Sequence, residues 1–119
     1  MTRPYPDATT TWSAFTRTAG RIPNVDFVGS RDQSQEGAPY VWKTWTQVET
    51  IVNELAAGFI KLDLMPESFE EGQNWRLMGI YSKNREEWAF TALATQRQSG
   101  TVVAFYDTLG PSGVEFIIR

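Results

Sequence analysis

The sequence predicts an α/β fold in which a β-hairpin and a long helix precede a β-α-β unit. The first reason is the order of strand, helix and strand from Asn74 to Tyr106, because a connection of this length can carry a crossover between parallel strands. The second is the continuously apolar run TVVAFY from Thr101, the pattern of a parallel strand covered on both faces. The crossover is expected to be right-handed.

Composition narrows the classes of function before any single residue is considered. The chain has 119 residues and is 41% hydrophobic, which is enough for the core of one domain. Lys and Arg number 11 against 14 Asp and Glu, and the basic residues are scattered, so we expect no nucleic acid partner. Because the sequence has neither cysteine nor histidine, it offers no thiol chemistry, no disulfide and no imidazole metal ligand.

The first residues predict an intracellular chain with a short lead. Residues 1–10 lack the apolar centre of a signal peptide, and we interpret them as a flexible lead. The sequence has no apolar stretch long enough to span a bilayer. Residues 11–119 are then expected to form the folded part.

The first folded elements are predicted to be a short helix and a hairpin. Residues 11–22 carry apolar side chains at helical spacing and stop before Pro23, which indicates a helix. Its buried side is expected to hold Trp12, Phe15 and Ala19. The stretch DFVGSRD from Asp26 is typical of a brief strand, the polar residues 31–38 of a turn, and PYVWKTW of the returning strand.

The longest predicted helix starts at a capping box and carries a buried stripe. In this box the hydroxyl of Thr46 would accept a hydrogen bond from a helical amide while Glu49 reaches back to the cap. The stripe recurs at steps of three and four residues and consists of Val48, Ile51, Val52, Leu55, Ala56, Phe59 and Ile60. Pro66 and the polar SFEEGQN stretch are expected to follow the helix as a loop.

The same capping pattern predicts the helix of the β-α-β unit. After the strand NWRLMGIYS, Asn84 and Glu87 would form the start of a helix that continues to Arg97. Gly100 would then stop this helix before the last strand.

A final helix is predicted directly after the last strand. Ser112 and Glu115 form a third pair at capping-box spacing. Because the sequence given ends at Arg119, after little more than one turn, we expect it to end inside an element.

The turn after the last strand is the first candidate binding site. A strand that leads through a Gly-containing turn into a helix often binds phosphate, because free amides and the helix dipole favour an anion. However, neither nucleotide-binding glycine pattern fits Gly110 and Gly113, Asp107 would repel an anion, and no lysine follows. In the structural alternative, Asp107 and Thr108 hydrogen-bond the turn and Ser112 caps the helix.

Three other groups of residues each have a functional and a structural interpretation. Residues 83–87 could form a polar active site, although Asn84 as a cap with acids in the first helical turn accounts for the same residues. Glu70 and Glu71 could act as a carboxylate pair or simply remain solvated in a loop. The tryptophans could stack on sugars or bases, but we favour a role in the core for Trp12, Trp42, Trp45, Trp75 and Trp88.

Four stretches, in order, resemble one enzyme family. They are FVGSRD from Phe27, YVWKTWTQV from Tyr40, GIYSKNREEW from Gly79 and YDTLG from Tyr106. Together they look like the leading part of eukaryotic long-chain acyl-CoA synthetases, which are members of the adenylate-forming, AMP-binding superfamily. The resemblance covers about residues 11–119. Many relatives have Pro-Leu where this chain has Ala104 and Phe105, which is a small departure.

The resemblance implies an incomplete N-terminal part of an adenylate-forming fold and a two-step reaction. In the full-length enzyme a fatty acid and ATP would form an acyl-adenylate, and coenzyme A would then displace AMP; Mg is the metal expected. The family's phosphate-binding loop, its adenine and ribose region and its C-terminal lysine are not found in this sequence. The resemblance therefore assigns no catalytic, cofactor-binding or metal residue, and we expect this chain alone to be inactive.

Two hypotheses about the chain's role stay open. In the first, the chain is a piece of a long-chain fatty acid CoA ligase, and fatty acid, ATP and CoA bind only to the full enzyme. In the second, it is a non-catalytic relative that serves as a structural or interaction subunit of a larger assembly. The apolar last strand and the short final helix also predict that the isolated chain self-associates. The family resemblance implies a cytoplasmic location or a peripheral one on an organelle membrane.

Overall fold

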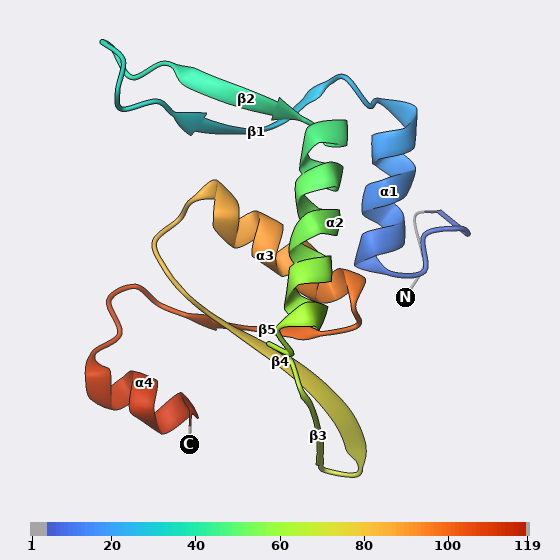
Figure 1. The fold of residues 1–119 in the computed structure, drawn as a ribbon, viewed down its shortest axis with the longest axis vertical. Helices are drawn as coiled ribbons and strands as arrows, with labels where there is room; N and C mark the ends of the chain where they lie inside the picture. Colours follow the sequence, from blue (N-terminus) through green and yellow to red (C-terminus); the bar gives the residue numbers. More distant parts are fainter. Residues whose placement is uncertain (1–4, 119) are drawn as a thin grey trace.

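A computed structural model describes residues 5–118 and confirms the α/β class (Figure 1). Helices α1 to α3 lie beside one another, the hairpin β1–β2 projects from one end of α2, and the sheet β3–β4–β5 lies at the other end. The elements are α1 (Thr11–Arg21), β1 (Asp26–Arg31), β2 (Tyr40–Thr44), α2 (Trp45–Lys61), β3 (Glu67–Glu70), β4 (Gln73–Tyr81), α3 (Glu86–Arg97), β5 (Thr101–Phe105) and α4 (Pro111–Ile118).

The core lies between α1, α2 and α3. Its buried members are Phe15, Ala19, Val48, Val52, Ala56, Phe90 and Ala94. The predicted stripe on α2 is therefore confirmed at its centre, and Ile51, Leu55 and Phe59 pack against the core while partly exposed. The prediction is wrong for Ile60, which is 66% exposed and is not among the residues that pack against the core.

The predicted β1–β2 hairpin is confirmed. The two strands pair antiparallel from Asp26 opposite Thr44 to Arg31 opposite Tyr40, with a bulge near the start of β1. Gly29 lies opposite Trp42, and a Cβ atom at position 29 would come within 2.8 Å of the indole ring. A glycine is therefore needed for Trp42 to lie across the hairpin.

The sheet combines an antiparallel and a parallel pair. β4 and β5 pair in parallel from Leu77 opposite Thr101 to Tyr81 opposite Phe105, as the sequence predicts. The expected loop after Pro66 is wrong, because Glu67–Glu70 forms strand β3 against β4. All four residues of β3 are exposed, so the strand has no apolar face that periodicity could reveal.

The start of α2 differs from the predicted capping box. Thr44 is the cap: its Oγ1 accepts from the Gln47 amide at 3.3 Å, and the Gln47 Oε1 accepts from the Thr44 amide at 2.8 Å. The predicted pair of Thr46 and Glu49 lies one half-turn inside the helix. The hydroxyl of Thr46 instead donates to the carbonyl of Pro23 at 3.1 Å and ties α2 to the preceding loop.

The starts of α3 and α4 also correct the capping predictions. Arg85 takes the cap position of α3 and makes no side-chain cap bond, so Asn84 is not the cap. Glu86 and Glu87 in the first turn face the positive end of the helix dipole and favour the same start. α4 begins at Pro111, a favoured first residue of a helix, which places Ser112 inside the first turn rather than at the cap.

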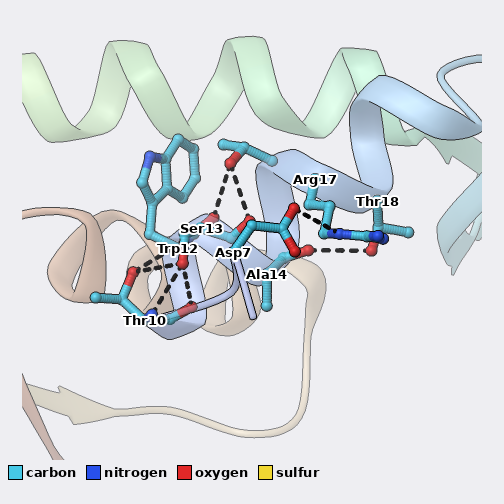
Figure 2. Close-up of polar contacts among 8 residues, drawn as sticks. Asp7, Thr10, Trp12, Ser13, Ala14, Arg17 and Thr18 are labelled. Carbon is cyan, nitrogen blue, oxygen red and sulfur yellow. Dashed lines mark hydrogen bonds and ion pairs between the residues drawn. The ribbon is translucent and has the colours of Figure 1, made fainter. Parts of the chain in front are cut away.

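Residues before α1 are tied to the helix by polar contacts (Figure 2). Thr10 caps α1 through a reciprocal pair of bonds with Ser13, at 3.0 and 2.8 Å. Asp7 forms an ion pair with Arg17 at 2.9 Å, and the Arg17 guanidinium lies over the ring of Tyr5. Of the expected lead, residues 1–4 lie outside the described residues, as does Arg119.

Candidate functional site

A polar hollow, here called the strand-end pocket, lies at the carboxyl ends of β4 and β5. Its volume is about 340 Å³, and it is lined by Ser82, Lys83, Asn84, Trp88, Ala104, Phe105, Tyr106 and Asp107. Open α/β sheets bind their ligands outside the carboxyl ends of parallel strands, so the position alone makes this hollow a candidate.

The two loops of the strand-end pocket are positioned by the parallel strand pair. β4 ends at Tyr81 opposite Phe105 of β5, so the segments that follow these two residues leave the sheet side by side. The Tyr81 hydroxyl donates to the carbonyl of Leu109 at 2.7 Å, which joins the end of β4 to the turn before α4. That turn is closed by the Leu109 amide, which donates to the carbonyl of Tyr106 at 2.9 Å.

The pocket combines two candidate groups that the sequence analysis treats separately. Lys83 and Asn84 come from the segment after β4, and Asp107 comes from the turn after β5. The pairing of strand ends in a parallel sheet is the signal that could have joined them, because the carboxyl ends of parallel neighbours meet at one edge. No lysine follows Asp107 in sequence, yet Lys83 lines the same hollow.

The remaining charges of residues 83–87 have partners outside the pocket. Arg85 and Glu87 form a bidentate pair, with bonds of 2.7 and 2.6 Å. The Arg85 guanidinium lowers the pKa of the Glu87 carboxyl to about 2, and the same pair raises the pKa of Arg85. Glu86 accepts two bonds from the Lys43 ammonium, at 2.7 and 2.9 Å, which links the hairpin to α3. These three residues are therefore held as structural ion pairs.

The start of α4 offers few free donors for a phosphate. Pro111 has no amide hydrogen, and the amides of Gly113 and Val114 both donate to the carbonyl of Gly110, at 3.0 and 3.1 Å. A phosphate cradle needs such amides unpaired. The geometry therefore favours the structural interpretation of the turn. Backbone hydrogen bonds stabilise the start of α4, and Ser112 does not cap it.

The other sequence candidates are spread over the molecule. Glu70 and Glu71 lie exposed at the end of the β3–β4 hairpin, where Glu71 and Gly72 adopt positive φ angles of a tight turn. Trp42 is exposed and stacks on Tyr40 of the hairpin, with ring centres 5.8 Å apart. Each of the other four tryptophans is partly buried: Trp12, Trp45, Trp75 and Trp88.

Two further findings concern metals and membranes. Within residues 5–118, no acidic side chains gather in a group that could hold a metal ion. None of the helices in that range has the length and apolar character needed to cross a membrane.

Comparison with known proteins identifies the family of this chain. The family model for AMP-binding enzymes matches residues 15–119. The chain belongs to the AMP-binding enzyme family. The resemblance drawn from the four sequence stretches is thereby confirmed, and the match includes α2, the β-α-β unit and both loops of the strand-end pocket.

Curated relatives in the AMP-binding family are named as CoA ligases or acyl-CoA synthetases. The chain is 30% identical over 119 residues to "Long-chain-fatty-acid–CoA ligase 6" of Rattus norvegicus, covering all of this chain and 16% of the relative. It is 34% identical over 117 residues to "Acyl-CoA ligase 891, peroxisomal" of Penicillium roqueforti, covering 96% of this chain and 16% of the relative. "Long chain acyl-CoA synthetase 4" of Arabidopsis thaliana is 32% identical over 109 residues, covering 90% of this chain and 15% of the relative.

The chain spans about one sixth of the length of these relatives. No solved structure matches the chain at a significant level.

Proposed function

We propose that this chain is the N-terminal part of an ATP-dependent long-chain fatty acid CoA ligase. The reaction of the whole enzyme converts a fatty acid, ATP and CoA into acyl-CoA, AMP and pyrophosphate. The observation that carries the proposal is the similarity along the whole chain to relatives named as long-chain fatty acid CoA ligases.

Within such an enzyme we assign this chain a scaffold role. Three helices bury a shared core and hold the β4–α3–β5 unit, while ion pairs fix the charged residues around the start of α3. The amides of Gly113 and Val114 at the start of α4 donate to the carbonyl of Gly110, so these two are not available to a nucleotide. Sites for ATP, Mg and CoA are therefore expected in the rest of the enzyme, and this chain alone is expected to be inactive.

The location of the enzyme is also proposed by analogy. One of the relatives is named as peroxisomal. A cytoplasmic position or a peripheral one on an organelle membrane fits the family.

The test compares two proteins: this chain of 119 residues, and the product of the complete reading frame that encodes it. Each is incubated with palmitate, ATP, Mg and CoA, and acyl-CoA is measured by liquid chromatography. We expect thioester from the longer protein and none from the chain alone. A longer protein that folds but forms neither acyl-adenylate nor thioester would reject the ligase and favour a non-catalytic structural subunit.

A further inference from the structure

The two faces of the β4–β5 pair are covered unequally. Ile80 is buried and lies beside Trp88 and Thr91, so α3 covers its face of the sheet. Because side chains alternate along a strand, Leu77 and Tyr81 lie on the opposite face. Leu77 is 48% exposed and Tyr81 is 52% exposed. At the end of the strand, α4 approaches Tyr81, with which its residues Pro111, Val114 and Ile118 line a hollow.

α4 itself is an apolar helix without a buried residue. Pro111, Val114 and Ile118 share one side of it and, with Tyr81, line a hollow of about 460 Å³. Ile118 is 72% exposed, and Phe116 is more exposed still. In Figure 1, α4 lies apart from α1, α2 and α3. A helix of eight residues is not expected to be stable in water without packing, so α4 needs cover.

We propose that this hollow, together with the exposed faces of α4 and of Leu77 and Tyr81, is a docking surface for the remainder of the same ligase. The occupant is an apolar segment of the polypeptide that follows residue 119, packed over Tyr81 and Ile118. The inference rests on the proposed function, because it requires that a longer protein exists.

Two observations favour a later segment of the same polypeptide as the occupant: the exposed face of the sheet and the greater length of the relatives. Parallel strands are found with both faces covered, yet one face of β4–β5 has apolar side chains exposed. In "Long-chain-fatty-acid–CoA ligase 6" the matching region is only 16% of the polypeptide, so most of that protein is available to supply the cover. Among the described residues that line the hollow, Glu115 is the one acidic or basic side chain, and an apolar partner is therefore favoured.

The first test is hydrogen exchange, read peptide by peptide with mass spectrometry. The chain of 119 residues at low concentration is compared with the product of the complete reading frame. Residues 111–118 are expected to exchange about 100-fold more slowly in the longer protein, because docking stabilises α4 against local opening. Amides at the centre of α2 serve as the control and should be protected in both proteins.

A pair of matched variants tests the surface itself. Ile118→Asp places a charge in the docking surface, whereas Ile60→Asp places the same charge on an isoleucine of α2 that is similarly exposed in this chain. In the longer protein, Ile118→Asp should return residues 111–118 to fast exchange, while Ile60→Asp should leave their protection unchanged.

The outcomes separate this inference from the proposed function. Protection of α4 in a longer protein that makes no thioester would keep the docking surface and reject the ligase. Thioester formation with α4 exchanging as fast as in the isolated chain would reject the docking surface alone. Protection that disappears when the longer protein is diluted to a monomer would also overturn the inference, because the cover would then be a second copy.

Discussion

Glu86 and Glu87 are adjacent acids at the start of α3 with different partners. Lys43 holds Glu86 from the hairpin, whereas Glu87 pairs with Arg85 two residues earlier. Glu86 therefore joins the hairpin to α3, whereas Glu87 stabilises a local turn next to the strand-end pocket.

The Arg85–Glu87 pair gives a prediction about pH. The folded-state pKa of Glu87 is about 2, below its ordinary value of 4.5. A lowered carboxyl pKa stabilises the fold above the unfolded value, so this contribution should be present above pH 4.5 and lost as pH falls from 4.5 to 2. In an NMR titration, Arg85→Ala should raise the Glu87 pKa towards its ordinary value, while Lys83→Ala should leave it in place. An unchanged pKa in Arg85→Ala would contradict the assigned cause.

The hydroxyl of Thr44 caps the start of α2. Thr44→Ala should lower the free energy of unfolding by about 1 kcal/mol, because the Gln47 amide loses its acceptor. Thr50→Ala is the control, since the Thr50 hydroxyl is exposed and bonds only to a carbonyl of its own helix. Chemical denaturation measures both. Equal losses would indicate that the Thr44 cap has no special role.

Among the elements, α2 carries the largest share of the core. Val48, Val52 and Ala56 are fully buried on one side, and Glu54 is exposed on the other. Val52→Ala should cost about 2 kcal/mol of unfolding free energy, from lost burial and the cavity left behind. Leu55→Ala should also destabilise the fold, whereas Glu54→Ala should cost little. Denaturation midpoints that are the same for Val52→Ala and Glu54→Ala would mean that the helix faces another way.

The Lys43–Glu86 ion pair joins the hairpin to α3. Both side chains of the Lys43–Glu86 pair are largely shielded, at 29 and 16% exposure, whereas those of Arg85 and Glu87 are mostly exposed. A double-mutant cycle with Lys43→Met and Glu86→Gln should therefore give a coupling of about 1 kcal/mol or more. The same cycle on the exposed Arg85–Glu87 pair is the comparison and should give the smaller value. A hairpin that keeps its NMR shifts and its stability in both Lys43 and Glu86 variants would show that the pair does not anchor it.

Elements with an apolar pattern could be predicted from sequence, and those defined by polar contacts could not. The stripe of α2 follows from helical periodicity, the β1–β2 hairpin from two strand-like stretches around a polar turn, and the parallel β4–β5 pair from the continuously apolar run of β5. The cap of α2 was misplaced by two residues because Thr44 and Thr46 are both followed, three residues later, by a side chain that can complete a capping box. β3 was missed because its exposed residues ESFE have no buried side.

The strand-end pocket could not be predicted from sequence patterns either. Lys83, Asn84 and Asp107 were each noted in the sequence, but more than twenty positions separate Asn84 from Asp107. Only the register of β4 against β5 brings their loops to one edge of the sheet. The Lys43–Glu86 contact likewise depends on how the hairpin leans on α3, which no local pattern encodes.

Exposed apolar side chains predict self-association of the isolated chain. Phe116, Ile117 and Ile118 of α4 are exposed, and so is Tyr106 in the turn before this helix. Size-exclusion chromatography with light scattering at several concentrations should show oligomers or aggregates, and Ile118→Asp should reduce them. A monodisperse monomer with a cooperative thermal transition would contradict this prediction.

We propose that these 119 residues form a scaffold of an AMP-binding enzyme without a nucleotide site of their own. The test is a calorimetric titration of the purified chain with ATP and Mg. We expect no saturable heat at micromolar ATP, because the amides of Gly113 and Val114 are paired and the basic side chains Arg85 and Lys43 are held in ion pairs. Saturable micromolar binding that is lost in Lys83→Ala would contradict it and would place a nucleotide in the strand-end pocket, which Lys83 lines.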